Sequence, residues 1–238
     1  MYDLSIVIPA YNEEKKISRD IEAVYEYFKK NSIKGELIIV NDGSKDQTYS
    51  VASSLASKFT SLRVLTYKKN RGKGYAIKTG IMEATGEYIL VADSGLCVPF
   101  KCTNLGLELL RNGNDVAIGS RRTRDDKSKI IVHQPLYRIL GSKLFHLLIK
   151  ISNLIPEGIE DTQCGFKLFK KDVAHKIFKK IFTEKFMWDI EVLRIASKEK
   201  YKLSVFPVEW SNDPDTRYNP LIGSFENLLQ IVNIILRT

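Results

Sequence analysis

Four apolar runs in the first hundred residues each stop abruptly at polar or glycine-rich residues. The runs are Ile6–Ile8, Ile38–Val40, Val64–Leu65 and Ile89–Val91. Apolar residues at helical spacing lie between them, and strands that alternate with helices in this way indicate βαβ units and a mostly parallel sheet. Open sheets of this class bind ligands at the carboxyl ends of their strands. The residues that follow each run are therefore the first candidates for a functional site.

The element pattern extends over most of the chain. The expected strands are Leu4–Ile8, Leu37–Val40, Arg63–Thr66, Tyr88–Val91 and Asp115–Ile118. Helical stripes contain Ile17, Ile21, Val24, Tyr25 and Phe28, then Val51, Leu55 and Phe59 after a capping Asp46, and then Ile77 and Ile81. Further stripes over Leu136–Ile155 and Phe225–Leu236 predict C-terminal amphipathic helices. The sequence therefore predicts an α/β fold, with one domain over residues 1–238.

Charge is unevenly distributed along the 238 residues, whose formal net charge is +9. Residues 121–150 contain eight Lys and Arg residues against Asp125 and Asp126, a net +6. Such a stretch favours an anionic partner: a phosphate, an acidic lipid surface or a nucleic acid. A nucleic-acid-binding module would explain the charge but not the acids at the strand ends, so no nucleic-acid partner is expected.

Cysteine usage and the N-terminal sequence indicate the compartment. Cys97, Cys102 and Cys164 match neither a disulfide framework nor a zinc site, so we expect reduced packing residues. Met1–Ala10 has no basic start followed by a long apolar segment, so no signal peptide is expected. No run approaches the ~18 apolar residues of a spanning helix. The prediction is a cytoplasmic protein.

Two carboxylates and two cations follow the predicted strands: Asp42, Arg71, Lys73 and Asp93. A carboxylate can accept from a base or ribose, cations meet phosphate, and a second carboxylate helps hold a divalent metal. The glycines of Asn70–Tyr75 would let the backbone approach a phosphate, with free amides at the start of the next helix. This mixture favours a nucleoside diphosphate.

Two later segments, Asp161–Phe169 and Trp188–Glu191, also contain acids. Asp189 and Glu191 are two residues apart, so on a helix they point in different directions and on a strand to the same face. One can serve chemistry while the other caps or pairs. The sequence alone does not rank them.

Six ordered blocks together resemble the inverting family 2 glycosyltransferases, in particular the dolichyl-phosphate glucosyltransferase and polyprenyl-phosphate mannose synthase branch. The blocks are Val7–Glu14, Val40–Ser44, Asn70–Gly74, Gly119–Arg121, Asp161–Lys167 and Trp188–Glu191. They cover almost the whole chain. The resemblance implies a GT-A fold, a Rossmann-like mostly parallel sheet flanked by helices, with 1–120 as the half that binds the nucleotide sugar. Residues 121–238 would bind the acceptor and face the membrane.

The resemblance also implies roles for individual residues. The nucleotide sugar would be bound through Pro9, Tyr11, Glu13, Asp42 and Lys73, joined by Arg71 as a phosphate-binding cation. Gln163 and Asp189 match positions that line the donor and acceptor pocket. Arg121 and the basic loop after it would receive the phosphate of a polyprenyl phosphate, with the amphipathic helix on the membrane surface. Expected catalytic residues are Asp93, Asp189 and Arg121, in a peripheral protein on the cytoplasmic face of a membrane.

The chain departs from the family at the Asp-X-Asp triplet, which here reads Asp93-Ser94-Gly95. The second carboxylate, commonly the direct metal ligand, is missing. Four alternatives follow: Asp93 and donor oxygens hold Mg²⁺ or Mn²⁺, another acid such as Asp189 takes part, metal dependence is weak, or the chain binds donor without catalysis. The metal prediction thus rests on Asp93.

The expected reaction is a single displacement with inversion, from UDP-glucose or GDP-mannose to a polyprenyl or dolichyl phosphate. Catalysis reduces to positioning the reactants and neutralising charge on the departing diphosphate, because the acceptor phosphate is already anionic. With a saccharide acceptor, Asp189 would be the preferred base. A nucleotide-sugar pyrophosphorylase would need its basic glycine-rich turn after the first strand, where this chain has Pro9–Asn12.

Overall fold

The computed structural model describes residues 1–122, 129–130, 155–156, 158–212 and 220–237. In chain order the elements are β1 Leu4–Ala10, α1 Ile17–Lys30, β2 Gly35–Asn41, α2 Thr48–Ser54, η1 Leu55–Ser57, β3 Leu62–Thr66, α3 Lys73–Glu83, β4 Tyr88–Val91, η2 Phe100–Cys102, α4 Thr103–Arg111, β5 Val116–Ser120, β6 Lys129–Ile130, β7 Lys167–Lys170, α6 Lys171–Lys180, α7 Trp188–Lys198, β8 Leu203–Pro207, β9 Glu209–Trp210 and α8 Pro220–Arg237. The five predicted strands are thus confirmed, with small shifts at their ends. The predicted helix over Leu136–Ile155 lies outside the described part of the chain, apart from its last residue, Ile155.

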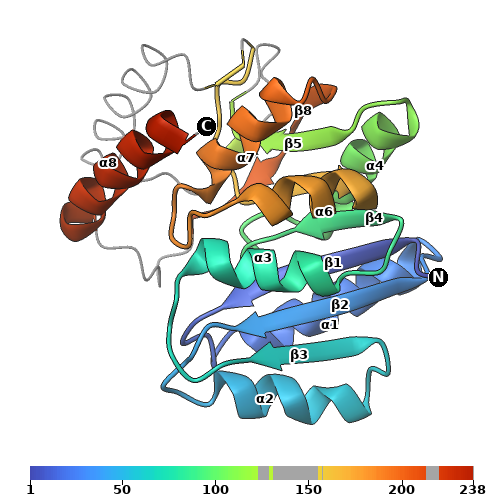
Figure 1. The fold of residues 1–238 in the computed structure, drawn as a ribbon. Coiled ribbons are helices and arrows are strands. Elements are labelled where there is room, and N and C mark those ends of the chain that lie inside the picture. The colour runs from blue at the N-terminus through green and yellow to red at the C-terminus, as the bar shows by residue number, and fades with distance from the viewer. Residues whose placement is uncertain (123–128, 131–154, 157, 213–219, 238) are drawn as a thin grey trace.

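Seven strands form one sheet in the order β3-β2-β1-β4-β7-β5-β8, and β6 pairs with β9 in a second, two-stranded sheet (Figure 1). Strands β3, β2, β1 and β4 run parallel, which confirms the predicted mostly parallel α/β sheet. Strand β7 is antiparallel to both β4 and β5, while β5 and β8 are parallel. The four parallel strands bring their carboxyl ends to one edge, where the sequence places the candidate site.

Helices cover both faces of the large sheet, because the buried strands present apolar side chains to both sides. In β1, Leu4, Ile6 and Ile8 belong to the core on the α1 and α4 face. Val7 points to the opposite core, with α3, α6 and α7. Helix α3 lies very close to the strands, since a Cβ on Gly80 would sit 2.4 Å from Cγ1 of Val7. These layers fix the position of the loops at the sheet edge.

Helix α8 contains the predicted C-terminal stripe of Phe225–Leu236. Ile231 and Ile234 are buried against Met187 and Ile190. Four large apolar side chains of the helix are exposed: Leu229, Val232, Ile235 and Leu236. No helix in the described part of the chain is long and apolar enough to cross a bilayer.

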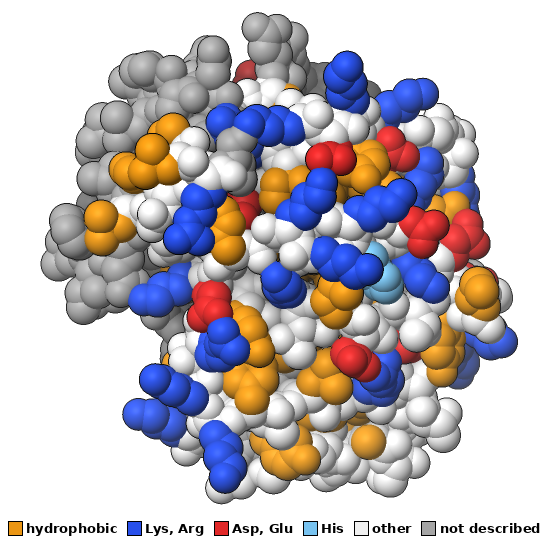
Figure 2. Space-filling model, viewed as in Figure 1, with side chains coloured by type: hydrophobic (Ala, Val, Ile, Leu, Met, Phe, Trp, Pro, Cys, Tyr) orange, Lys and Arg blue, Asp and Glu red, His pale blue; other side chains and the backbone are white. Residues whose placement is uncertain are grey.

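Lys and Arg side chains are spread widely over the face that carries α3, α6 and α7 (Figure 2). Acidic side chains are fewer on this face. Much of the predicted basic stretch, including Arg124, Lys127, Arg138, Lys143 and Lys150, lies outside the described residues. All three cysteines are free thiols, and burial raises the pKa of Cys164 to about 12.

Candidate active site

Asp42, at the end of β2, holds the loop that leads into α3. Its Oδ1 accepts hydrogen bonds from the hydroxyl of Tyr67 at 2.7 Å and the amide of Arg71 at 2.8 Å. Its Oδ2 accepts from Nδ2 of Asn70 and the amide of Gly72, both at 2.9 Å. Each carboxylate oxygen therefore binds two donors within the protein. The predicted contact of Asp42 with a nucleotide stays a prediction, and the structure adds a second role.

The first amides of α3 are also engaged within the protein. The amides of Gly74 and Tyr75 donate to the carbonyls of Lys185 and Glu184, at 3.0 and 2.9 Å. Gly72 has φ +111°, a conformation that favours glycine, and a Cβ there would sit 2.7 Å from the carbonyl of Glu184. The prediction of free phosphate-binding amides was therefore wrong at these positions, because the segment before α7 packs over the start of α3.

An Asp42→Asn variant is expected to lower the free energy of unfolding by about 1–3 kcal/mol, since buried donors lose their acceptors. An amide oxygen replaces only one of the two carboxylate oxygens, so the donors facing the new NH₂ group are left unpaired. Urea denaturation followed by circular dichroism measures the change. Asp172→Asn, at an exposed site in α6, is the control and should cost no more than about 0.5 kcal/mol. An equal, small loss of stability in both variants would contradict a stabilising role for the hydrogen bonds that Asp42 accepts.

The side chain of Arg71 is directed away from Asp42. Its Nη2 pairs with Oε1 of Glu184, and its guanidinium lies 3.5 Å from the ring centroid of Tyr75. The side chain of Arg71 is 43% exposed. Phosphate binding by Arg71 stays a prediction and would require exchange with Glu184.

Lys73 and Asp93 form an ion pair at the carboxyl-terminal edge of the parallel strands. Nζ of Lys73, in the first turn of α3, lies 2.6 Å from Oδ1 of Asp93, just after β4. Burial works against the charge of Lys73, but Asp93 and Asp189 hold its pKa above the ordinary value. Gly165 leaves room for Asp93, since a Cβ at residue 165 would sit 2.2 Å from its Oδ2. Two of the sequence blocks, those that contain Lys73 and Gly165, thus meet at the carboxylate of Asp93.

The turn after Asp93 is held from behind by Asp20 of α1. Oδ2 of Asp20 accepts from the amide of Gly95 at 2.7 Å and the hydroxyl of Ser94 at 2.9 Å. Asp20 is 1% exposed, and burial raises its pKa. Gly95 itself has φ +95°. The backbone at the third position of the triplet is therefore one that L side chains rarely adopt.

Lys167 of β7 is fully buried and uses all three of its donors. Nζ donates to the carbonyls of Thr162 and Cys164, at 3.0 and 2.6 Å, and to Oδ1 of Asp189. Burial raises the pKa of Asp189. Glu191, the next acidic residue along α7, instead accepts hydrogen bonds from the amides of residues 182 and 183. It therefore fixes the backbone of the segment before α7. The two acids thus have different partners: Glu191 accepts from backbone amides, and Asp189 pairs with Lys167. Which of them serves chemistry stays a prediction.

Arg121, one residue after β5, is bound bidentately by Asp161. Nε and Nη2 donate to the two carboxylate oxygens at 2.8 and 2.7 Å, and the backbone amide of Arg121 adds a third bond. Burial opposes the charge of Arg121, but Asp161 outweighs it and keeps the pKa of Arg121 above the ordinary value. Binding of an acceptor phosphate by Arg121 stays a prediction.

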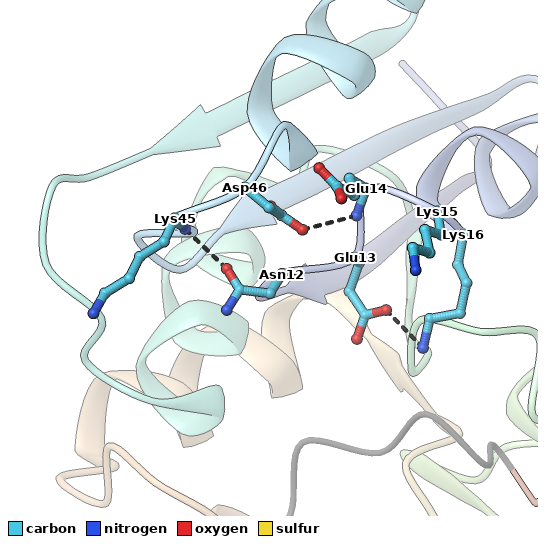
Figure 3. Close-up of a pocket in the computed structure, with 7 residues that line it drawn as sticks. All are labelled: Asn12, Glu13, Glu14, Lys15, Lys16, Lys45 and Asp46. Atoms are coloured by element: carbon cyan, nitrogen blue, oxygen red, sulfur yellow. Dashed lines mark hydrogen bonds and ion pairs between the residues drawn. The ribbon is translucent and has the colours of Figure 1, made fainter.

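A cavity of about 440 Å³ lies between the loops after β1 and β2 (Figure 3). Its lining residues are Asn12, Glu13, Glu14, Lys15, Lys16, Lys45 and Asp46. Hydrogen bonds tie the two loops together, including Glu14 N to Asp46 Oδ2 at 3.2 Å and Lys45 N to Asn12 Oδ1 at 2.8 Å. Glu13 is the predicted donor-binding residue among the lining set. Pro9 and Tyr11, which shortly precede the lining residues in the sequence, are half-buried. Gln163 is exposed in the turn before β7.

A divalent metal fits the described residues poorly. The triplet after β4 offers one carboxylate, Asp93, and that carboxylate is ion-paired with Lys73. Elsewhere in the described part of the chain, no group of three or more His, Cys, Asp or Glu residues is placed to hold a metal ion. The predicted metal at Asp93 therefore lacks a second protein carboxylate in the triplet.

Sequence reasoning missed two residues of this site, and each left a signal. Asp20 lies on the apolar stripe of α1, between Ile17 and Ile21, and a carboxylate on a buried helix face needs partners. Lys167 interrupts the apolar run of Phe166 and Leu168 in the same way. Their burial was readable from the pattern, but their partners were not.

The site can be compared with known proteins on this basis. The sequence model of Glycosyl transferase family 2 matches residues 5–178. The chain belongs to glycosyl transferase family 2. The matched range includes both residues of the Lys73–Asp93 pair and the bidentate partners Arg121 and Asp161.

Several curated members of this family are similar to the chain. A dolichyl-phosphate beta-glucosyltransferase of Trichomonas vaginalis is 36% identical over 220 residues, which cover 87% of this chain and 65% of that protein. One from Homo sapiens is 36% identical over 230 residues, which cover 91% and 70%. The chain thus spans slightly under two thirds of the first relative's length and somewhat more of the second.

Solved structures whose fold is similar to that of this chain include glucosyl-3-phosphoglycerate synthase from Mycobacterium tuberculosis. Its complex with Mn²⁺ and UDP-glucose has a TM-score of 0.70 at 17% identity and covers 99% of this chain and 78% of that chain. Its complex with UDP gives the same TM-score at 18% identity, covering 99% and 79%. These likenesses show the GT-A fold of this family 2 glycosyltransferase.

Proposed function

We propose that this chain transfers glucose from UDP-glucose to dolichyl phosphate or a similar polyprenyl phosphate, with inversion at the sugar. The names of the similar curated proteins support this acceptor and sugar. One observation carries the proposal: Nζ of Lys73 is ion-paired with Asp93 at the carboxyl ends of the parallel strands, the edge at which open sheets of this class bind ligands. Lys73 would provide a cation for the donor diphosphate there, and Arg121, just after β5, would provide one for the acceptor phosphate.

The reaction needs little proton chemistry. An oxygen of the acceptor phosphate attacks the anomeric carbon, and the bond from that carbon to the diphosphate oxygen breaks, so UDP leaves with the electron pair. The acceptor oxygen is already anionic, so no base is needed. Lys73 neutralises charge on the leaving diphosphate, and Arg121 orients the acceptor. Asp189 is paired with Lys167, which supports a role in positioning over one as a base.

Peripheral attachment to a membrane is part of the proposal, since the acceptor is a lipid. The exposed apolar side chains of α8, Leu229, Val232, Ile235 and Leu236, support it. A surface of this kind can dip into the acyl boundary while nearby cations meet lipid phosphates. The predicted cytoplasmic side of the membrane belongs to the same proposal. A metal at Asp93 does not, because Lys73 is paired there.

A transfer assay tests the function. Purified protein is incubated with a short polyprenyl phosphate and radiolabelled UDP-glucose or GDP-mannose, and label in the lipid extract is counted. We expect UDP-glucose to be used at least about tenfold faster than GDP-mannose. Faster label transfer from GDP-mannose would overturn the glucose assignment. Label moved only to an added saccharide would favour a saccharide acceptor, and UDP binding without any transfer would identify a donor-binding protein that is not catalytic.

A further inference from the structure

We propose that the ammonium of Lys73 takes the place of a divalent metal in this site, so that the donor diphosphate binds and departs without one. The inference rests on the proposed function, because it concerns the diphosphate of a UDP-sugar. The residues that carry it lie around the triplet Asp93-Ser94-Gly95.

The backbone of the triplet is built for glycine rather than for a second carboxylate. Gly95 has φ +95° and the following Leu96 has φ +53°. An aspartate at residue 95 would be strained in this conformation. Asp20 fixes the turn, because its Oδ2 accepts from the amide of Gly95 and the hydroxyl of Ser94. Glycine at residue 95 therefore fits the conformation of this turn, which a second aspartate would strain.

The remaining carboxylate already has a cation. Oδ1 of Asp93 is 2.6 Å from Nζ of Lys73, and the two side chains are 33% and 24% exposed. A metal bound by Asp93 would place a second positive charge beside this ammonium and would compete with it for the same oxygen. An ammonium at this point can instead exchange one of its three donors from Asp93 to a diphosphate oxygen.

Lys73 differs from the other cations of the candidate site in its partners and its exposure. Lys167 is fully buried with three acceptors, and Arg121 is held by both oxygens of Asp161. Arg71 is paired with Glu184 on the surface. Lys73 is partly exposed and is ion-paired with one carboxylate, that of Asp93. Asp93 in turn lies against Gly165. Lys73 is therefore the cation best placed to meet the diphosphate at the moment of bond cleavage, and no proton is transferred in that step.

Titration calorimetry with UDP tests the proposal independently of turnover. The dissociation constant of UDP is measured in about 1 mM EDTA and in about 2 mM MnCl₂. In a second measurement, electron paramagnetic resonance follows Mn²⁺ with protein and UDP present. We expect the two dissociation constants to agree within about threefold. The Mn²⁺ signal should match that of UDP and Mn²⁺ without protein.

Substitutions identify the group responsible. In EDTA, Lys73→Met should weaken UDP binding by about 10–100-fold, and Lys73→Arg should recover part of the loss because it keeps the charge. Lys58→Met is the matched control: Lys58 is also paired with a carboxylate, Glu22 at 3.2 Å, but lies by η1 on the exposed surface. Circular dichroism verifies that each variant is folded.

The outcomes separate this inference from the proposed function. UDP binding that is more than about tenfold tighter with Mn²⁺, or equal binding by Lys73→Met and wild type, would overturn the role of Lys73. Absence of UDP binding in both conditions would overturn the inference and the proposed function together. Metal-independent binding of UDP without sugar transfer would uphold the inference and reject the proposed reaction.

Discussion

Lys167→Met is expected to lower the free energy of unfolding by about 3–5 kcal/mol, which is typical when one partner of a buried ion pair is removed. Methionine keeps the length and the packing of the side chain but removes its charge and its donors. The carboxylate of Asp189 and the carbonyls of Thr162 and Cys164 then stay buried without their common partner. The pKa of Asp189, already raised by burial, should rise further.

The measurement is urea denaturation at pH 7, with Lys170→Met as the control. Lys170 lies on the same strand and is also paired with an aspartate, Asp115 at 3.1 Å, but it is 36% exposed. The control should therefore lose at most about 1 kcal/mol. The double variant Lys167→Met/Asp189→Leu should recover part of the loss, since it removes the unpaired charge. A single-variant loss as small as that of the control would show that the buried lysine is dispensable.

Asp161→Ala is expected to lower the free energy of unfolding by about 3 kcal/mol at pH 7. The variant removes three hydrogen bonds that Arg121 donates, two of them from its guanidinium, and leaves the guanidinium without its carboxylate. The variant Arg121→Lys would keep the positive charge but not the bidentate pair with Asp161, because an ammonium lacks the two-pronged geometry of a guanidinium. The effect concerns stability first, whatever the role of Arg121 toward an acceptor.

The loss should depend on pH in a defined direction. Burial opposes the ionisation of Asp161, but Arg121 outweighs it and holds the pKa of this carboxyl below its ordinary value. A lowered pKa in the folded state stabilises the protein fully above the unfolded pKa of about 3.9, and this contribution disappears as pH falls through the folded pKa. Wild type and variant should therefore differ most at neutral pH and converge below about pH 4. A difference that stays constant from pH 7 to pH 3, by urea denaturation at each pH, would contradict the pairing.

The alternation of apolar strands and amphipathic helices was sufficient to predict the parallel part of the sheet. Runs such as Ile38–Val40 are buried on both faces, and this leaves little choice of architecture. The edge that collects Asp42, Lys73 and Asp93 follows from the same reasoning, because parallel strands end on one side. The position of β7 did not follow. A short strand that enters antiparallel between β4 and β5 depends on tertiary contacts, which periodicity does not encode.

The chemistry of the candidate site was predictable by residue type but not by partner. Sequence patterns indicated that Lys73 and Asp93 belong together, and the structure pairs them. The same patterns predicted free amides at the start of α3, whereas the carbonyls of Lys185 and Glu184 accept hydrogen bonds from them. Contacts of this kind join residues more than a hundred positions apart. They are set by how α7 and its preceding segment pack on α3, which is a property of the assembled core.

The insertion of β7 ties the stability of the sheet to a late part of the chain. Strands β4 and β5 each pair with β7, so a fragment that ends after β5 would leave a bare backbone edge on β4. Exposed edges of this kind invite pairing with other molecules. Truncated forms of the chain should for this reason aggregate rather than fold as a smaller nucleotide-binding unit, and C-terminal deletions for crystallisation or assay should be placed beyond β8.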